Sequence, residues 1–257
     1  MKIFSSFLSG TRFFLAATLA ALLSIPATFA QSDADLTAAV HKTLGGSSFK
    51  NVQISVQNGI ATLSGSVSLY DDKARADLKT HHVKGVQGVR NNIEVAGTDI
   101  PDAQLQEKLV KAISYDRVGY GTTIFNSISV SVENGVVTLG GYAYGPTDAA
   151  SAVSLAANTR GVKDVIDNIT ADPPSPMDDR IRAATARAVY GFPMLQQFAM
   201  DPAKPIRIQV SGGHVTLFGV VDTQAEKDAA GIRANTVPGV FSVDNQLVVA
   251  QAPAEKP

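Results

Sequence analysis

Apolar and polar residues alternate in three widely separated segments of this chain. In each segment valine or isoleucine occupies every second position, with serine, glutamine or arginine between them. Side chains two residues apart on a β-strand point to the same face of a sheet, so this alternation predicts strands with one buried face and one face in water. The inward positions are Val52, Ile54 and Val56, then Ile128, Val130 and Val132, then Ile206, Ile208 and Val210.

A tight turn and a second strand follow each of these segments. The turns read Asn58-Gly59, Asn134-Gly135 and Gly212-Gly213. A type I′ turn needs positive φ at both central residues, which Asn-Gly and Gly-Gly adopt most easily. The second strand then turns Leu63, Leu139 and Leu217 inward and the threonine before each of them outward, so each segment predicts a β-hairpin.

Helices are expected on both sides of each hairpin. Before it, an aspartate (Asp33, Asp102 or Asp178) is followed by apolar residues at four-residue spacing, which is less regular in the third copy because of Thr185. After it, helices are predicted over 71–83, 147–159 and 223–237, and a last strand over 89–95, 165–169 and 243–249. The order helix, strand, strand, helix, strand predicts an α+β fold. Each copy should be a small α/β sandwich, with a three-stranded mixed sheet and two helices on one face.

The same glycines and one polar residue recur in register in all three copies, which marks a repeated supersecondary unit. We expect the strand glycines to let a helix lie close over the sheet rather than to bind a ligand, and the polar residue to bond a nearby turn or helix end. These scaffold positions are Gly59, Gly65, Gly85 and Asn91 in copy one, Gly135, Gly141, Gly161 and Asp167 in copy two, and Gly213, Gly219, Gly239 and Asn245 in copy three.

The copies differ between the first helix and the first strand. From the opening aspartate to the hairpin glycine the distance is 26 residues in copy one, 33 in copy two and 35 in copy three. The inserts of copies two and three concentrate apolar residues, and these either form a membrane-touching or partner-binding patch or extend the core. The candidates for the patch are Tyr120 in copy two and Phe192, Met194, Leu195 and Phe198 in copy three.

Copy one offers a different candidate surface. On its second predicted helix Arg75, Lys79 and His82 follow one another at i, i+4 and i+7, a basic edge that could meet anionic lipid headgroups. Because aspartates (Asp71, Asp72 and Asp77) are interleaved with them, the alternative is an ordinary solvated face of mixed charge.

Residues 1–30 have the pattern of a secretory signal, with basic residues, an apolar run and small residues before a cleavage expected between Ala30 and Gln31. Without this leader, 20 of the 22 basic residues remain against 23 acidic ones, a formal charge of −3, which argues against nucleic-acid binding. The chain has no cysteine, so we expect no lipid anchor and no thiolate metal site. Four scattered histidines predict no metal site, and no transmembrane span is expected in the mature chain.

The joint pattern of an Asn-Gly hairpin, a Thr-Leu-x-Gly strand, about twenty residues of helix and a Gly-Val-x-x-Val-x-Asn-x-Leu end resembles the BON domain of bacterial envelope proteins. The resemblance implies no catalytic role and an association with the cell envelope, often through phospholipid. It divides the chain into a signal peptide (1–30), three BON domains (31–97, 101–171 and 177–250) and a tail (251–257).

Three functions are compatible with these features. The first is a non-enzymatic periplasmic protein that contacts membrane phospholipid and supports the envelope under osmotic or other stress. The second is a scaffold that binds an envelope protein or another copy of itself. The third and weaker one is the binding of a small solute or ion. No combination of nucleophile, base and electrophile indicates an enzyme, and no cofactor is expected.

Overall fold

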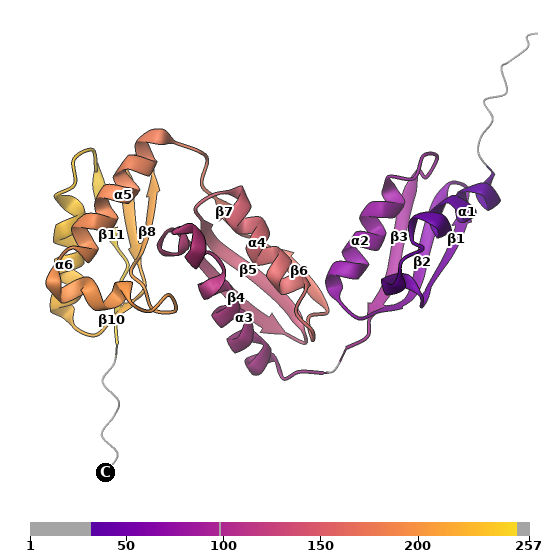
Figure 1. The fold of residues 1–257 in the computed structure, drawn as a ribbon, viewed down its shortest axis with the longest axis horizontal. Coiled ribbons are helices and arrows are strands. Elements are labelled where there is room, and N and C mark those ends of the chain that lie inside the picture. The colour runs from indigo at the N-terminus through magenta and orange to yellow at the C-terminus, as the bar shows by residue number, and fades with distance from the viewer. Residues whose placement is uncertain (1–31, 98, 251–257) are drawn as a thin grey trace, which may run out of the picture. The chain divides into compact units, whose positions relative to one another are not determined.

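The computed structural model describes residues 32–97 and 99–250 and contains the predicted unit three times (Figure 1). The leader and the tail lie outside the described residues. Copy one consists of α1 (Asp33–Thr43), η1 (Ser47–Phe49), β1 (Val52–Gln57), β2 (Ile60–Val67), α2 (Tyr70–His81) and β3 (Gly88–Val95). β2 is central, pairs antiparallel with β1 and parallel with β3, and so confirms the mixed sheet.

Copies two and three keep this order but divide the last strand. Copy two consists of α3 (Asp102–Asp116), η2 (Val118–Tyr120), η3 (Thr123–Phe125), β4 (Ser127–Glu133), β5 (Val136–Ala143), α4 (Pro146–Ala157), β6 (Asp164–Asp167) and β7 (Thr170–Ala171). Copy three consists of α5 (Pro176–Tyr190), η4 (Pro193–Ala199), β8 (Arg207–Ser211), β9 (His214–Phe218), β10 (Val220–Val221), α6 (Gln224–Asn235), β11 (Ser242–Asn245) and β12 (Val248–Val249). β6 and β7 both pair with β5, while β11 pairs with β9 and β12 with β10.

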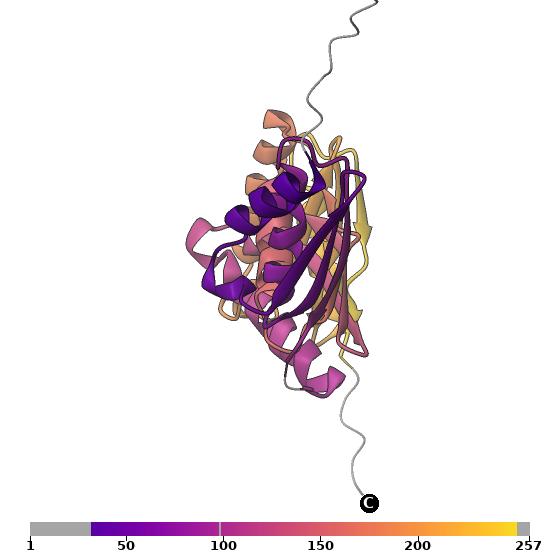
Figure 2. The same ribbon diagram turned by 90° about the vertical axis from the view of Figure 1, so that its right-hand side faces the viewer.

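Each core lies between one sheet face and two helices. In copy one, nearest the viewer in Figure 2, α1 and α2 cover the same side of the sheet. The central leucines Leu63, Leu139 and Leu217 are fully buried. The second helix of each copy presents a buried alanine to the core, Ala76, Ala152 or Ala230, as the aligned register predicted. Apolar and polar residues alternate in the first strand of each copy because one face of the sheet packs on the helices and the other meets water.

The hairpin turns have the predicted left-handed geometry, and an acidic side chain caps each of them. Asn58 and Gly59 have φ of 52° and 75°. The carboxylate of Asp33 accepts hydrogen bonds from both of their amides, at 2.8 and 3.0 Å. Asp102 does the same for the second turn and Asp178 for the third. The opening aspartate thus ties the first helix to the hairpin, a role that its place at a helix start did not reveal.

Glycine is needed in the central strands for a different reason from the expected one. Gly65 and Gly141 have φ of 100° and 82°, and a Cβ on Gly65 would lie 2.0 Å from the carbonyl oxygen of Asn51. On Gly141 it would lie 2.1 Å from that of Ser127, and on Gly219 2.7 Å from that of Pro205. The obstacle is the backbone at or just before the start of the paired strand and not a helix lying over the sheet. The expectation of a close helix approach is therefore wrong, and these glycines permit a left-handed kink in the central strand.

The recurring polar residue of the last strand bonds a helix, as expected. Asn91 donates to the carbonyl of Lys73 in α2 at 2.9 Å and accepts from the amide of Ile93. Asn245 makes the same pair of bonds, the first to the carbonyl of Lys227 in α6 at 2.7 Å. Asp167 keeps only the bond from a following amide, that of Ile169, because an ionised carboxylate has no proton to donate.

Candidate functional site

The inserts of copies two and three meet each other. The extra length enters before the first strand, as predicted, as a longer α3 with η2 and η3 in copy two and as η4 with the loop after it in copy three. The hydroxyl of Tyr115, at the end of α3, donates to Asp201 in that loop at 3.2 Å. Arg207, the first residue of β8, donates from one terminal nitrogen to the carbonyls of Thr123 and Asn126, at 3.1 and 2.6 Å. The least repeated parts of the two copies therefore form one junction.

A buried acid at the third position of the second helix holds each insert in place. In copy two, Asp148 accepts from Arg117 at 2.7 Å, and also from Thr122 and Asn126. In copy three, Glu226 accepts from Gln197 of η4 at 2.8 Å and closes a capping box with Thr223. Sequence reasoning missed these acids, although each follows the strand glycine by seven residues in all three copies.

Apolar side chains of the junction divide between core and surface. Leu195 and Phe198 are buried in the copy-three core, so they extend that core and are not available as a contact surface. Phe192 is half-buried with the guanidinium of Arg233 over its ring at 4.3 Å, and Met194 is exposed. Tyr120 is the most exposed of the candidates, at 71%.

Further exposed apolar residues lie in the same two inserts as the candidates. We define the insert patch as Tyr115, Val118 and Tyr120 of copy two together with Met200 of copy three, which is 83% exposed. The Tyr115–Asp201 bond places Met200 beside the copy-two residues. Arg117 stacks on the ring of Tyr120 at 3.9 Å while its Nε binds Asp148. Tyr120 is thus held by a cation that is itself fixed to a helix, and a fixed aromatic loses less entropy when it binds.

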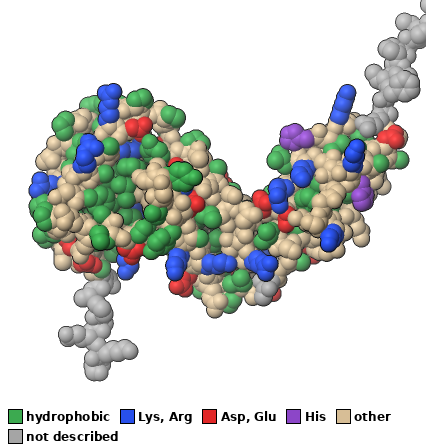
Figure 3. All heavy atoms as spheres, in the orientation of Figure 1, with side chains coloured by type: hydrophobic (Ala, Val, Ile, Leu, Met, Phe, Trp, Pro, Cys, Tyr) green, Lys and Arg blue, Asp and Glu red, His purple; other side chains and the backbone are tan. Residues whose placement is uncertain are grey.

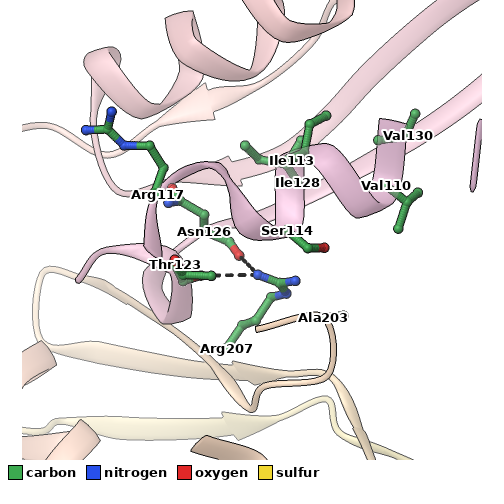
Figure 4. Close-up of a pocket in the computed structure, with 10 residues that line it drawn as sticks. All are labelled: Val110, Ile113, Ser114, Arg117, Thr123, Asn126, Ile128, Val130, Ala203 and Arg207. Carbon is green, nitrogen blue, oxygen red and sulfur yellow. Dashed lines mark hydrogen bonds between the residues drawn. The ribbon is translucent and has the colours of Figure 1, made fainter. Parts of the chain in front are cut away.

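Beside the insert patch lies a cavity of about 90 Å³. Its lining residues, drawn in Figure 4, come mainly from α3, η3 and β4 of copy two and from the loop after η4 and the start of β8 in copy three. Arg207 is half-buried there, and this burial lowers the pKa of its guanidinium from its ordinary value. Thr123 is buried as well, and its hydroxyl has no hydrogen-bond partner among the described residues.

The basic edge of copy one is brought together only in part. Arg75 pairs with Asp71 at 2.8 Å and also with Asp72. Lys79 lies over the ring of Phe49. The ring of His82 forms a hydrogen bond with the carbonyl of Leu78. Asp72 is buried, so the alternative of an ordinary solvated face is wrong for this residue. Figure 3 shows the basic side chains of copy one as separate spots on the visible face.

Metal ligands and membrane spans were not expected. In residues 32–97 and 99–250 no three histidine or acidic side chains gather as they would around a metal ion. None of the helices in that part of the chain has the length and hydrophobicity that a bilayer crossing requires.

The fold and the junction together describe a protein of tandem small α/β domains with divergent inserts. The sequence model of the BON domain family matches the chain three times, over residues 32–97, 101–173 and 195–251. The chain therefore belongs to the BON domain family, as its motifs predicted. It is 28% identical over 196 residues to the osmotically-inducible protein Y of Escherichia coli, an alignment that covers 72% of this chain and 90% of that protein.

Two solved structures are also similar, at low scores. CdsD, a structural protein of the type III secretion system of Chlamydia trachomatis, is 19% identical with a TM-score of 0.23, covering 85% of this chain and 93% of its own. The PrgH periplasmic domain is 12% identical with a TM-score of 0.21, covering 79% and 96%. Scores this low do not establish a common fold for the whole chain.

Proposed function

We propose that this chain is a non-enzymatic periplasmic protein that binds anionic phospholipid at the envelope under osmotic or similar stress. The predicted leader and the similarity to an osmotically inducible protein support the compartment and the condition. The observation that carries the lipid contact is the insert patch, where exposed tyrosines and apolar side chains from two copies converge.

The chemistry of the insert patch suits a membrane interface. Tyrosine has an apolar ring and a polar hydroxyl, so it is favoured at the level of the headgroups. Exposed Lys111 lies one helical turn before Tyr115, and exposed Lys204 lies in the same loop as Met200. Each cation near an anionic membrane surface contributes about 1 kcal/mol to binding. The patch therefore combines apolar insertion with charge attraction.

Copy one supports this contact less well. Its Arg75 is neutralised by two aspartates, so of the three residues of the basic edge Lys79 and His82 remain to meet a headgroup. We propose the basic edge as a secondary contact and the insert patch as the main one.

Flotation of the chain with vesicles tests the proposal. The wild type should float with vesicles that contain phosphatidylglycerol and less with neutral ones, and most at low salt. Replacing both exposed residues, Val118→Ser with Tyr120→Ser, removes apolar contact and should weaken binding about tenfold. Ile232→Ser is the matched control because Ile232 is 66% exposed on α6, outside the patch.

Two results would contradict the lipid contact. One is a wild type that does not float with any vesicle, and the other is a double variant that floats as well as Ile232→Ser. If cross-links from the position of Tyr120 to an envelope protein or to a second copy accompany either result, the scaffold alternative is favoured.

A further inference from the structure

Arg207 is a half-buried cation without a counter-ion. None of the ion pairs in the described part of the chain includes it, and its burial lowers its pKa, so the charged form is poorly compensated. Its hydrogen-bond partners are two backbone carbonyls, and the ionisable hydroxyl of Tyr190 is near enough to affect its pKa. An arginine that loses part of its hydration often has a carboxylate partner, because desolvating an unpaired charge is costly.

The guanidinium keeps one edge free for an anion. Both bonds to copy two leave from Nη1, toward the carbonyls of Thr123 and Asn126. Nε and Nη2 have no hydrogen-bond partner among the residues that the structure describes. These two nitrogens donate in parallel, a geometry that matches the two oxygens of a carboxylate. Nη1 therefore fixes the group to copy two, and Arg207 is one of the residues that line the cavity (Figure 4).

A second polar group in the cavity also lacks a partner. Thr123 is only 9% exposed, and its hydroxyl makes no hydrogen bond within the described residues. A buried hydroxyl without a partner costs free energy, which a bound group that accepts or donates one hydrogen bond would recover. Thr123 and Arg207 line the same cavity, so one ligand can satisfy both.

The rest of the lining is mixed, with Ser114, Arg117 and Asn126 as polar members and several aliphatic side chains. The aliphatic side chains include Val110 and Ile113 of α3 and Ile128 and Val130 of β4. Asp201, near the rim, already accepts bonds from Tyr115 and from the amide of Ala203. A volume of about 90 Å³ has room for several water molecules or for one small organic ion.

From this arrangement we propose that the cavity at the junction of copies two and three binds a small aliphatic monocarboxylate. The carboxylate accepts from Nε and Nη2 of Arg207, the Thr123 hydroxyl donates to one of its oxygens, and the short alkyl chain lies against the valines and isoleucines. Inorganic phosphate offers the charge without the alkyl chain, and a neutral alcohol offers the chain without the charge. Both should bind less well than the carboxylate.

Amide spectra of the whole exported chain, titrated with sodium butyrate at constant ionic strength, test this site. Saturable shifts should appear at the amides of Ser114, Thr123 and Arg207, with a dissociation constant of about 1 mM or below. Butanol and phosphate should each bind about tenfold more weakly, because each loses one half of the contact. Arg207→Lys keeps the charge but loses the parallel donors, and should weaken butyrate about tenfold.

A second variant keeps the test valid if Arg207→Lys loosens the junction. Val110 is 45% exposed at the cavity wall, so Val110→Trp should fill the cavity and abolish butyrate binding while leaving the fold intact. Arg233→Lys, outside the cavity, is the matched control and should bind butyrate as the wild type does. No saturable shift in the wild type, equal binding of butanol, or equal binding of phosphate would overturn the proposal. Unchanged butyrate binding in Val110→Trp would overturn it as well.

Discussion

Three aspartates at the starts of the first helices hold the three hairpin turns. Each accepts from the two successive amides of a left-handed turn, which otherwise have no partner in the hairpin. In copy three, burial raises the pKa of the Asp178 carboxyl, but hydrogen bonds from the amides of Gly213 and Gly212 lower it. The charge of Arg182 lowers it further, so the net pKa lies below its ordinary value of 3.8.

The lowered pKa of Asp178 predicts acid sensitivity of copy three. A carboxyl whose folded pKa is below its unfolded pKa stabilises the fold above the unfolded value, and this stability is lost as the pH falls through the folded one. We expect Asp178→Asn to lower the free energy of unfolding at neutral pH by about 1–3 kcal/mol and to remove this part of the pH dependence.

Urea unfolding at a series of pH values, followed at amides of copy three, measures this effect. Asp228→Asn on α6 is the control and should keep the pH dependence of the wild type, since Asp228 is exposed and bonds only Gln224 among the described residues. A wild-type midpoint that does not fall below about pH 4 would contradict the role of Asp178.

At the scale of elements, the spacing of apolar residues in the sequence predicted the strands and helices that bury one face. The two-residue period of Val52 to Val56 and the four-residue period of α1 and α3 each follow from one face packing on the core. The reason for Gly65 and Gly141 was not predictable in this way, because the obstacle is a carbonyl of the neighbouring strand and depends on register.

Replacing one of two adjacent glycines in β5 tests this account of the kink. Gly141→Ala places a methyl group 2.1 Å from the Ser127 carbonyl oxygen at a positive φ, so we expect a loss of at least about 2 kcal/mol in the stability of copy two. Gly140→Ala is the matched control, since its Cβ meets only the Ser129 hydroxyl at 3.1 Å. Equal melting temperatures of the two variants would refute the explanation.

The buried acids of the second helices show why the site itself was hard to predict. Asp148 lies 31 residues from Arg117 in the sequence, and Tyr115 lies 86 residues from Asp201. No local period connects such pairs. The sequence did indicate that the inserts are where the copies diverge, but not that Leu195 and Phe198 point inward while Tyr120 and Met200 remain exposed.

At the scale of the whole molecule, repetition and divergence separate scaffold from recognition. The residues that recur hold turns, kinks and strand ends, whereas the two inserts form the junction with its patch and its cavity. Arg182 of copy three also binds Asp172, which directly follows β7, at 2.9 Å with both side chains buried. The connection between copies two and three is therefore fixed by a buried ion pair.

Hydrogen exchange of the chain from Gln31 onward, with and without phosphatidylglycerol vesicles, tests the central claim most directly. Membrane contact excludes water from the amides it covers, so we predict slower exchange in residues 115–125 and 199–204 and unchanged exchange in the three hairpin turns. Slower exchange confined to α2 of copy one, or no change in any segment while the chain is bound to vesicles, would contradict the claim that the inserts carry the function.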